Sequence, residues 1–151
     1  MQSSSSIKNR LSGDELRYLD ASIPLCVMTE EPKGKFEACL RIMEEIEAGR
    51  ERVGTNVFTI AEIFHILTSR ERMKPSEARE KLSALLDCAG LKLVDVHADL
   101  CAPSLALAID YGVDFVDAYN ALTMQKYRIS EIYSLDSHYN KIPGMKRLER
   151  I

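Results

Sequence analysis

The chain has 151 residues, of which 46% are hydrophobic and 28% are charged, and its net charge is −3 at pH 7. This length fits one domain of ordinary size, and the slightly acidic balance excludes wholesale attraction to nucleic acid or anionic membrane. No apolar run reaches the roughly 18 residues of a membrane span, and the N-terminus has no signal-peptide core, so we expect a cytoplasmic protein.

The predicted elements alternate between strands and helices. Residues 1–15 lack periodicity and are predicted to form a flexible N-terminal tail before a domain that spans residues 16–151. Residues 17–20 are predicted to form a short strand that ends in a turn over residues 21–24. The remaining patterns predict, in order, helix 35–48, strand 52–56, helix 59–72, a helix that begins at Pro75, strand 91–96, helices 98–111 and 115–127, strand 131–135 and a short edge strand 145–148.

This alternation predicts the fold class. Strands that are joined to helices by short links indicate right-handed crossovers, and such crossovers place the strands parallel to one another. We therefore expect an α/β domain with a central, mainly parallel sheet of four to five strands and helices on both faces.

Four carboxylates fall where strands end or where the following helices begin. Asp20 ends the first predicted strand, Glu62 and Asp117 lie in the first turns of predicted helices, and Asp136 follows the fourth strand. In open α/β sheets, ligands gather beyond the carboxyl ends of the strands, so these side chains are expected to converge. A cluster of acids repels itself unless a cation holds it, and oxygen ligands suit Mg²⁺ or Mn²⁺. The pattern thus predicts a metal site suited to phosphodiester cleavage.

Each of these acids also has a structural explanation. Thr59 and Glu62 have capping-box spacing, and Asp114 and Asp117 form a near variant of it. Acids in the first turn of a helix interact favourably with its dipole, and the two acids that follow strands could be turn residues. The joint placement of the four acids, rather than any single one, favours the metal site.

Four short segments resemble a known family. They are residues 18–22 (YLDAS), 59–63 (TIAEI), 114–118 (DFVDA) and 134–136 (SLD), and residues 141–145 add a fifth. In this order they resemble the signature stretches and the closing segment of PIN-domain proteins, from about Arg17 to Leu148. The resemblance implies a three-layer α/β/α PIN-like fold and a metal-dependent endoribonuclease, many prokaryotic members being toxins of VapC type. Asp20, Glu62, Asp117 and Asp136 would then be the catalytic, metal-binding acids.

Four further polar residues could support these acids. Ser22 and Ser134 match positions where the family often has Ser or Thr, and we expect them to orient a carboxylate, although Ser22 could instead cap a short helix. Asp114 shares a helix face with Asp117 and is predicted chiefly as an N-cap. Asn120 lies on the same face and could hydrogen-bond a metal-bound water or a phosphate.

The segment after Asp136 departs from the family pattern. A charged pair and then Phe are common there, whereas this chain has Ser137, His138 and Tyr139. Tyr139 could keep the aromatic role. His138 could approach a substrate, although a solvated loop histidine is the commoner role.

The resemblance also implies partners. RNA would be the substrate, an antitoxin protein would place an Arg or Lys near the acids, and the chain would form a homodimer. The apolar helices 35–48 and 59–72 could form the dimer face, although core packing explains most of their apolar residues. Candidate RNA contacts are the cations Lys126, Arg128, Lys141, Lys146 and Arg147.

Other functions fit the sequence less well. The four cysteines form no CxxC pair, so a zinc site is not expected. A phosphatase with Asp20 as nucleophile would need a second Asp where Ser22 stands. A non-catalytic PIN-like scaffold that binds RNA or protein is the main alternative, and the four intact acids argue against it.

Overall fold

Five strands pair side by side in the order β3-β2-β1-β4-β5, and every pair is parallel. The computed structural model describes residues 16–151, so the tail predicted for residues 1–15 lies outside the described residues. The predicted parallel sheet of four to five strands is confirmed. Its strands are β1 (Arg17–Leu19), β2 (Val53–Thr55), β3 (Leu91–Leu93), β4 (Glu131–Tyr133) and β5 (Lys146–Leu148).

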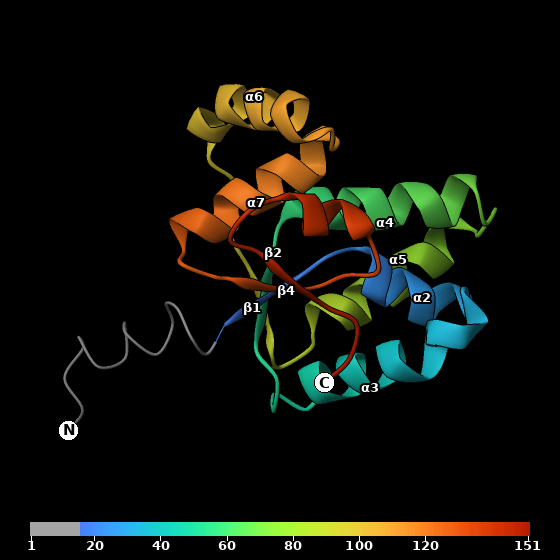
Figure 1. The fold of residues 1–151 in the computed structure, drawn as a ribbon. Helices are drawn as coiled ribbons and strands as arrows, with labels where there is room; N and C mark the ends of the chain where they lie inside the picture. The colour runs from blue at the N-terminus through green and yellow to red at the C-terminus, as the bar shows by residue number, and fades with distance from the viewer. Residues whose placement is uncertain (1–15) are drawn as a thin grey trace.

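Six α-helices of the described chain flank this sheet: α2 (Ser22–Thr29), α3 (Phe36–Glu47), α4 (Val57–Ser69), α5 (Pro75–Leu86), α6 (Cys101–Tyr111) and α7 (Phe115–Lys126). In Figure 1, α3 and α7 lie on opposite sides of the sheet, and α6 lies outside α7. None of these helices is both long and apolar enough to cross a membrane. The three-layer α/β/α arrangement predicted for the chain is therefore confirmed.

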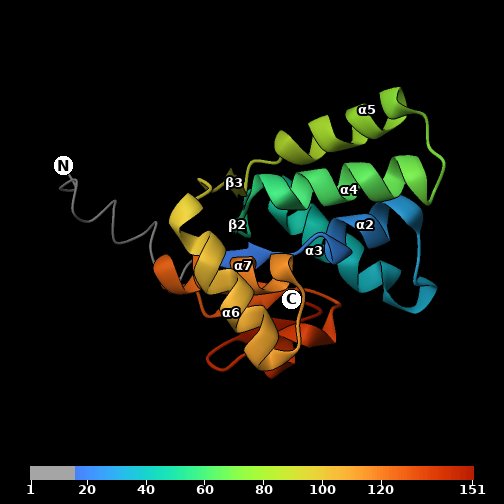
Figure 2. The same ribbon diagram turned by 90° about the horizontal axis from the view of Figure 1, so that it is seen from above.

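The two faces of the sheet bury separate apolar clusters. Tyr18 and Ile132 pack with residues of α7, whereas their neighbours Leu19 and Tyr133 pack with residues of α2, α3, α4 and α5. Successive side chains of a strand point to opposite faces, so a strand that is covered on both sides is apolar at consecutive positions. Figure 2, viewed from above, shows α4 beside α5 and, apart from them, α6 beside α7.

The apolar stripes of α3 and α4 are used in the core. Ile42 and Ile46 of α3 and Ile63 and Leu67 of α4 are fully buried. These four side chains are therefore core residues and not part of the homodimer face that the helical pattern allowed, whereas Val57 and Phe64 of α4 are exposed.

The segment after β1 is a helix and not the predicted turn. Pro24 suggested a chain break, but it lies in the first turn of α2, where a backbone N–H has no partner within the helix. Ile23 and Cys26 of this helix are buried against the core. Tertiary burial thus favours the helix, and Pro24 is compatible with it.

Helix α4 begins two residues earlier than predicted. Asn56 is its N-cap, and the Asn56 side-chain oxygen accepts hydrogen bonds from the backbone N–H groups of Phe58 and Thr59. The capping box predicted for Thr59 and Glu62 is therefore wrong. Glu62 lies in the second turn of α4 and not in the first.

The order in which the chain adds strands to the sheet reverses at β1. From β1 the chain moves first to β2 and β3 on one side, and later to β4 and β5 on the other. Such a switch point opens a crevice at the carboxyl ends of the two central strands. Asp20 follows β1 and Ser134 follows β4 at this crevice.

Replacing Asn56 with alanine should lower the free energy of unfolding by about 2–4 kcal/mol. The substitution removes the N-cap of α4 and the buried amide that donates to the Tyr18 hydroxyl and to the Asn120 carbonyl. Lys74→Ala is the matched control, because Lys74 holds the N-cap position of α5 without a side-chain hydrogen bond. It should change stability by less than about 0.5 kcal/mol. Urea unfolding measures both, and equal stability of the two variants would contradict this role of Asn56.

Candidate metal centre

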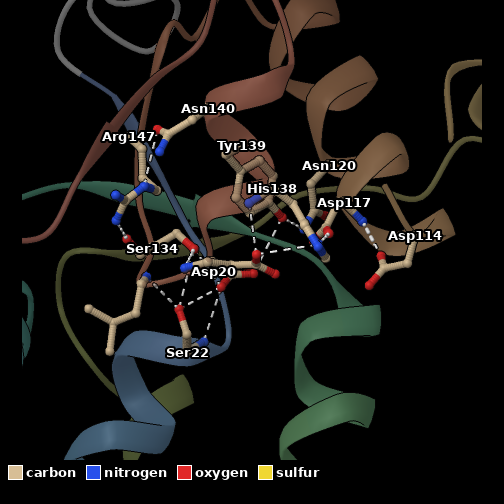
Figure 3. A network of polar contacts seen from close by, with 12 residues as sticks. Asp20, Ser22, Asp114, Asp117, Asn120, Ser134, His138, Tyr139, Asn140 and Arg147 are labelled. Atoms are coloured by element: carbon tan, nitrogen blue, oxygen red, sulfur yellow. Dashed lines mark hydrogen bonds and ion pairs between the residues drawn. The ribbon is translucent and has the colours of Figure 1, made fainter. Parts of the chain in front are cut away.

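Asp20 carries a buried carboxylate at the end of β1, and its side chain is held by protein donors (Figure 3). The residue is 6% exposed, and Oδ2 accepts from the Ser22 hydroxyl at 2.6 Å, the Ser134 hydroxyl at 2.8 Å and the Ser22 backbone N–H at 3.2 Å. Burial raises the pKa of Asp20, and these hydrogen bonds oppose that rise because they stabilise the ionised form. Among the described residues, Oδ1 receives one contact, from the Tyr139 hydroxyl at 3.3 Å. It is therefore the oxygen best placed to bind a cation.

The two serines join the ends of the central strands. Each hydroxyl donates its proton to Asp20 and accepts a backbone N–H: Ser22 from Leu135, and Ser134 from Asp136, both at 2.9 Å. Ala21, not Ser22, holds the N-cap position of α2, so the alternative capping role of Ser22 is wrong. The loop after β4 is thereby held against the end of β1.

A buried chain of polar side chains supports Asp20 from behind. The Asn120 amide donates to the Tyr139 hydroxyl at 2.9 Å, and the Asn56 amide donates to Asn120 Oδ1 at 2.8 Å and to the Tyr18 hydroxyl at 2.6 Å. All four side chains are at most 1% exposed. Asn120 therefore supports Tyr139 inside the protein. The sequence had suggested instead that Asn120 could contact a metal-bound water or a phosphate. Asn56 was not identified from the sequence as part of this network, although an Asn immediately before a helix is a common N-cap.

Helix α7 contributes two acids from its first turn. Asp114 is the N-cap, as predicted, and its Oδ1 accepts the Asp117 backbone N–H at 2.9 Å. Asp117 is 4% exposed; burial and the charges of Asp114, Asp136 and Asp20 raise its pKa to about 6, although a hydrogen bond with His138 opposes this rise. The capping role does not remove Asp114 from the site, because donor atoms of Asp114, Asp117 and His138 all lie within 4.8 Å of one another.

Asp136 and His138 lie on the loop that follows β4. Asp136 is the N-cap of the 3-10 helix η3 (Ser137–Lys141), and its Oδ1 accepts the His138 backbone N–H at 2.9 Å. The His138 ring is turned toward the acids: its Nδ1 lies 2.9 Å from Asp117 Oδ2 and 3.3 Å from Asp136 Oδ1. The hydrogen bond with Asp117 raises the pKa of His138. No periodicity or spacing in the sequence predicts the contact between His138 and Asp117.

Glu62 completes the acidic cluster from α4. It is an exposed residue, yet partial desolvation of its carboxyl group raises its pKa to about 7. The charge of Asp20 contributes next to this rise, followed by those of the other clustered acids, Asp114, Asp117 and Asp136. The four predicted acids therefore share one electrostatic site, which Asp114 and His138 extend. Its oxygen-rich donor set and mutual repulsion fit a divalent cation such as Mg²⁺ or Mn²⁺.

The candidate RNA-binding cations are not all near this site. Lys126 ends α7, and Arg128 lies in the link from α7 to β4. Lys146 begins β5. These three cations therefore lie at the amino-terminal edge of the sheet, opposite the acids. Arg147 is used inside the protein, because its guanidinium donates to the Ser134 carbonyl at 3.1 Å and to Asn140 at 3.2 Å. Lys141, in η3, is exposed, and its charge acts on His138.

The fold and the site define an α/β/α domain with an acidic cluster at the switch point of a parallel sheet. A family model described as the PIN domain matches residues 17–145. The chain therefore belongs to the PIN-domain family. No curated protein matched the sequence.

Several solved structures share this fold. VapC20 of Mycobacterium tuberculosis, a toxin that cleaves the sarcin-ricin loop, is 18% identical with a TM-score of 0.64, and the alignment covers 81% of this chain and 90% of that one. PAE2754 of Pyrobaculum aerophilum is 18% identical with a TM-score of 0.62, over 89% and 91%. VapBC2 of Rickettsia felis, bound to a DNA fragment from its promoter, is 11% identical with a TM-score of 0.60, over 88% and 97%. At these identities the similarity shows the fold.

The metal-free protein should become more stable as the pH falls from about 8 to about 5. The folded-state pKa values of Glu62 and Asp117, about 7 and about 6, lie above their ordinary values of 4.5 and 3.8. The folded chain thus binds protons that the unfolded chain releases, and stability is gained as the pH falls through these folded-state values and lost as it rises.

The Asp117→Asn variant tests this effect, because it removes one of the three carboxyl groups of the cluster whose pKa is raised, Asp20, Glu62 and Asp117. In EDTA its Tm should exceed that of the wild type at about pH 8, and the difference should shrink toward about pH 5. Differential scanning calorimetry measures both profiles. A Tm difference that does not change with pH would contradict the assignment.

Proposed function

We propose that this protein is a divalent-metal-dependent endoribonuclease and the toxin of a toxin–antitoxin pair. The observation that carries the proposal is the buried Asp20 carboxylate, which keeps one oxygen toward a cluster of acids at the switch point of the sheet. Burying an ionised carboxylate beside other acids is costly unless a cation compensates it. Membership of the PIN-domain family and a fold similar to VapC20, a sarcin-ricin loop cleaving toxin, support the same conclusion.

In this mechanism Asp20, Glu62, Asp117 and Asp136 would hold the cation. When bound, Mg²⁺ or Mn²⁺ would stabilise negative charge on the scissile phosphate and lower the pKa of the attacking water. Ser22 and Ser134 would keep the Asp20 carboxylate in one orientation through their hydrogen bonds. Lys141, at the same edge of the sheet, would contact the RNA backbone.

The net charge of the protein links RNA binding to the cation. A chain with net charge −3 and an acidic cluster repels phosphate. Without a cation, RNA should bind weakly at this site. The cytoplasmic location expected from the sequence forms part of this proposal, because the RNA substrate is found there.

A groove beside the acids fits an antitoxin segment. The groove, of about 440 Å³, lies between α2 and α4 and is lined at one end by Ser22 and Asp136. Its apolar residues include Leu25, Cys26 and Ile66. An antitoxin segment would bury an apolar side chain there and place an Arg or Lys against the carboxylates, which would exclude both cation and RNA. A solved toxin–antitoxin complex from Klebsiella pneumoniae shares the fold.

The proposed homodimer would need a different face from the one first considered. Val57 and Phe64 of α4 are partly exposed, but the more exposed apolar side chains are on α6, where Leu105 is 53% and Ile109 is 82% exposed. We therefore place the homodimer contact on α6.

The purified protein should cleave RNA with Mn²⁺ or Mg²⁺ and lose this activity in EDTA. Asp117→Asn should reduce the cleavage rate at least ~100-fold, because charge stabilisation by a metal is worth several kcal/mol. Glu37→Gln, an exposed acid on α3, is the control and should cleave normally. Gel analysis of single-stranded and structured RNA measures the rates. Cleavage that survives both EDTA and Asp117→Asn would exclude the metal mechanism, and no cleavage together with no metal bound in titration would favour the scaffold.

Expression of the wild-type chain should arrest growth, whereas the Asp117→Asn variant should not. If a neighbouring gene encodes a small DNA-binding protein, its co-expression should restore growth. Ile66→Arg, which places a charge in the groove, should remain toxic but escape this rescue, because the antitoxin side chain would lose its apolar contact. Leu86→Arg, at an exposed position on α5 outside the groove, is the matched control and should be rescued. Rescue of Ile66→Arg to the wild-type level would contradict the groove assignment.

A further inference from the structure

The His138 side chain is placed as part of the acidic site. Its Nδ1 lies 2.9 Å from Asp117 Oδ2 and 3.3 Å from Asp136 Oδ1, and a carboxylate oxygen of Asp114 also lies within 4.8 Å. Figure 3 shows the ring directed toward Asp117. The His138 ring therefore lies among three acids.

The position of His138 is fixed by the residues on either side. Its backbone N–H donates to Asp136, and the next residue, Tyr139, is fully buried with its hydroxyl held by Asn120. The His138 side chain itself is 40% exposed, so a small ion can reach it from solution. The ring is therefore held in place and accessible.

The donor spacing matches a metal coordination sphere. In an octahedron with bonds of about 2.1 Å, neighbouring ligand atoms are about 3 Å apart and opposite ones about 4.2 Å apart. The 2.9 Å between His138 Nδ1 and Asp117 Oδ2 corresponds to neighbouring ligands. Donor atoms of Asp114, Asp117 and His138 all lie within 4.8 Å of one another, so the three side chains could contact one ion.

We propose that His138 is a nitrogen ligand of the cation, next to Asp117, and that it shifts the preference of the site from Mg²⁺ toward Mn²⁺. Carboxylate and water oxygens suit Mg²⁺, whereas imidazole suits first-row transition metals and is a poor ligand for Mg²⁺. A site built from acids alone would not make this distinction. The inference rests on the proposed metal-dependent function and specifies its metal.

A competing role for the ring is to hydrogen-bond Asp117 without touching the metal. His138→Gln separates the two roles, because the glutamine amide can still donate to a carboxylate but has no imidazole nitrogen to bind a metal. His97→Gln is the matched control. His97 is bonded to the Tyr127 hydroxyl at 3.0 Å, at the opposite end of α7 from Asp117.

Pulsed electron paramagnetic resonance of the protein with Mn²⁺ alone reports the ligand directly. The wild type and His97→Gln should show the nitrogen coupling of a coordinated imidazole, and His138→Gln should lose it. Absence of this coupling in the wild type, or its persistence in His138→Gln, would overturn the assignment.

Calorimetric titration with each metal alone tests the selectivity. His138→Gln should bind Mn²⁺ at least ~10-fold more weakly and change its affinity for Mg²⁺ by less than ~3-fold. Equal changes for the two metals would overturn the selectivity. Wild-type protein that binds neither metal would also overturn the proposed function, whereas Mn²⁺ binding without nitrogen coupling would overturn the role of His138 alone.

Discussion

The negative charge of the Asp20 carboxylate, buried at the end of β1, constrains the rest of the site. An ionised group in a protein interior loses several kcal/mol of hydration, which must be offset by hydrogen bonds or by a cation. Three donors, from Ser22 and Ser134, meet one carboxylate oxygen, whereas the other oxygen receives one contact among the described residues, from the Tyr139 hydroxyl. Because these serines follow β1 and β4, the same bonds that stabilise the charge also hold together the two central strands at the switch point.

The support of Asp20 is continuous with the helices that carry the other acids. Tyr139, which contacts Asp20, is held by Asn120 of α7, and Asn120 is held by Asn56, the N-cap of α4. Asn56 therefore starts the helix that presents Glu62 and also completes the network behind Asp20. One buried network thus joins Asp20 to the helices that carry Glu62 and Asp117.

The sheet and most of the acids could be predicted because they follow from local patterns. Alternating apolar segments imply a parallel sheet, and residues that follow parallel strands meet at one edge, which brings Asp20 and Asp136 together. The hydrogen bonds of Asn56 could not be predicted in this way, because they join residues 38 and 64 positions apart. Periodicity also identifies an apolar helix face without saying what covers it, so the buried stripes of α3 and α4 resembled a dimer face. Pro24 was interpreted as a break because a proline in the first turn of a helix and one in a turn look alike in sequence.

The negative charge of the site affects both RNA binding and inhibition by an antitoxin under the proposed function. A cluster of acids in a protein of net charge −3 repels RNA, so a bound cation would have to reverse the local charge before a phosphate could approach. A cationic side chain from a partner would satisfy the same carboxylates without supplying a metal that activates water. Under the proposed function, the repulsion that makes the site depend on a metal would also let an antitoxin compete with that metal. His138 would add to this balance, because a nitrogen ligand strengthens the binding of a transition metal.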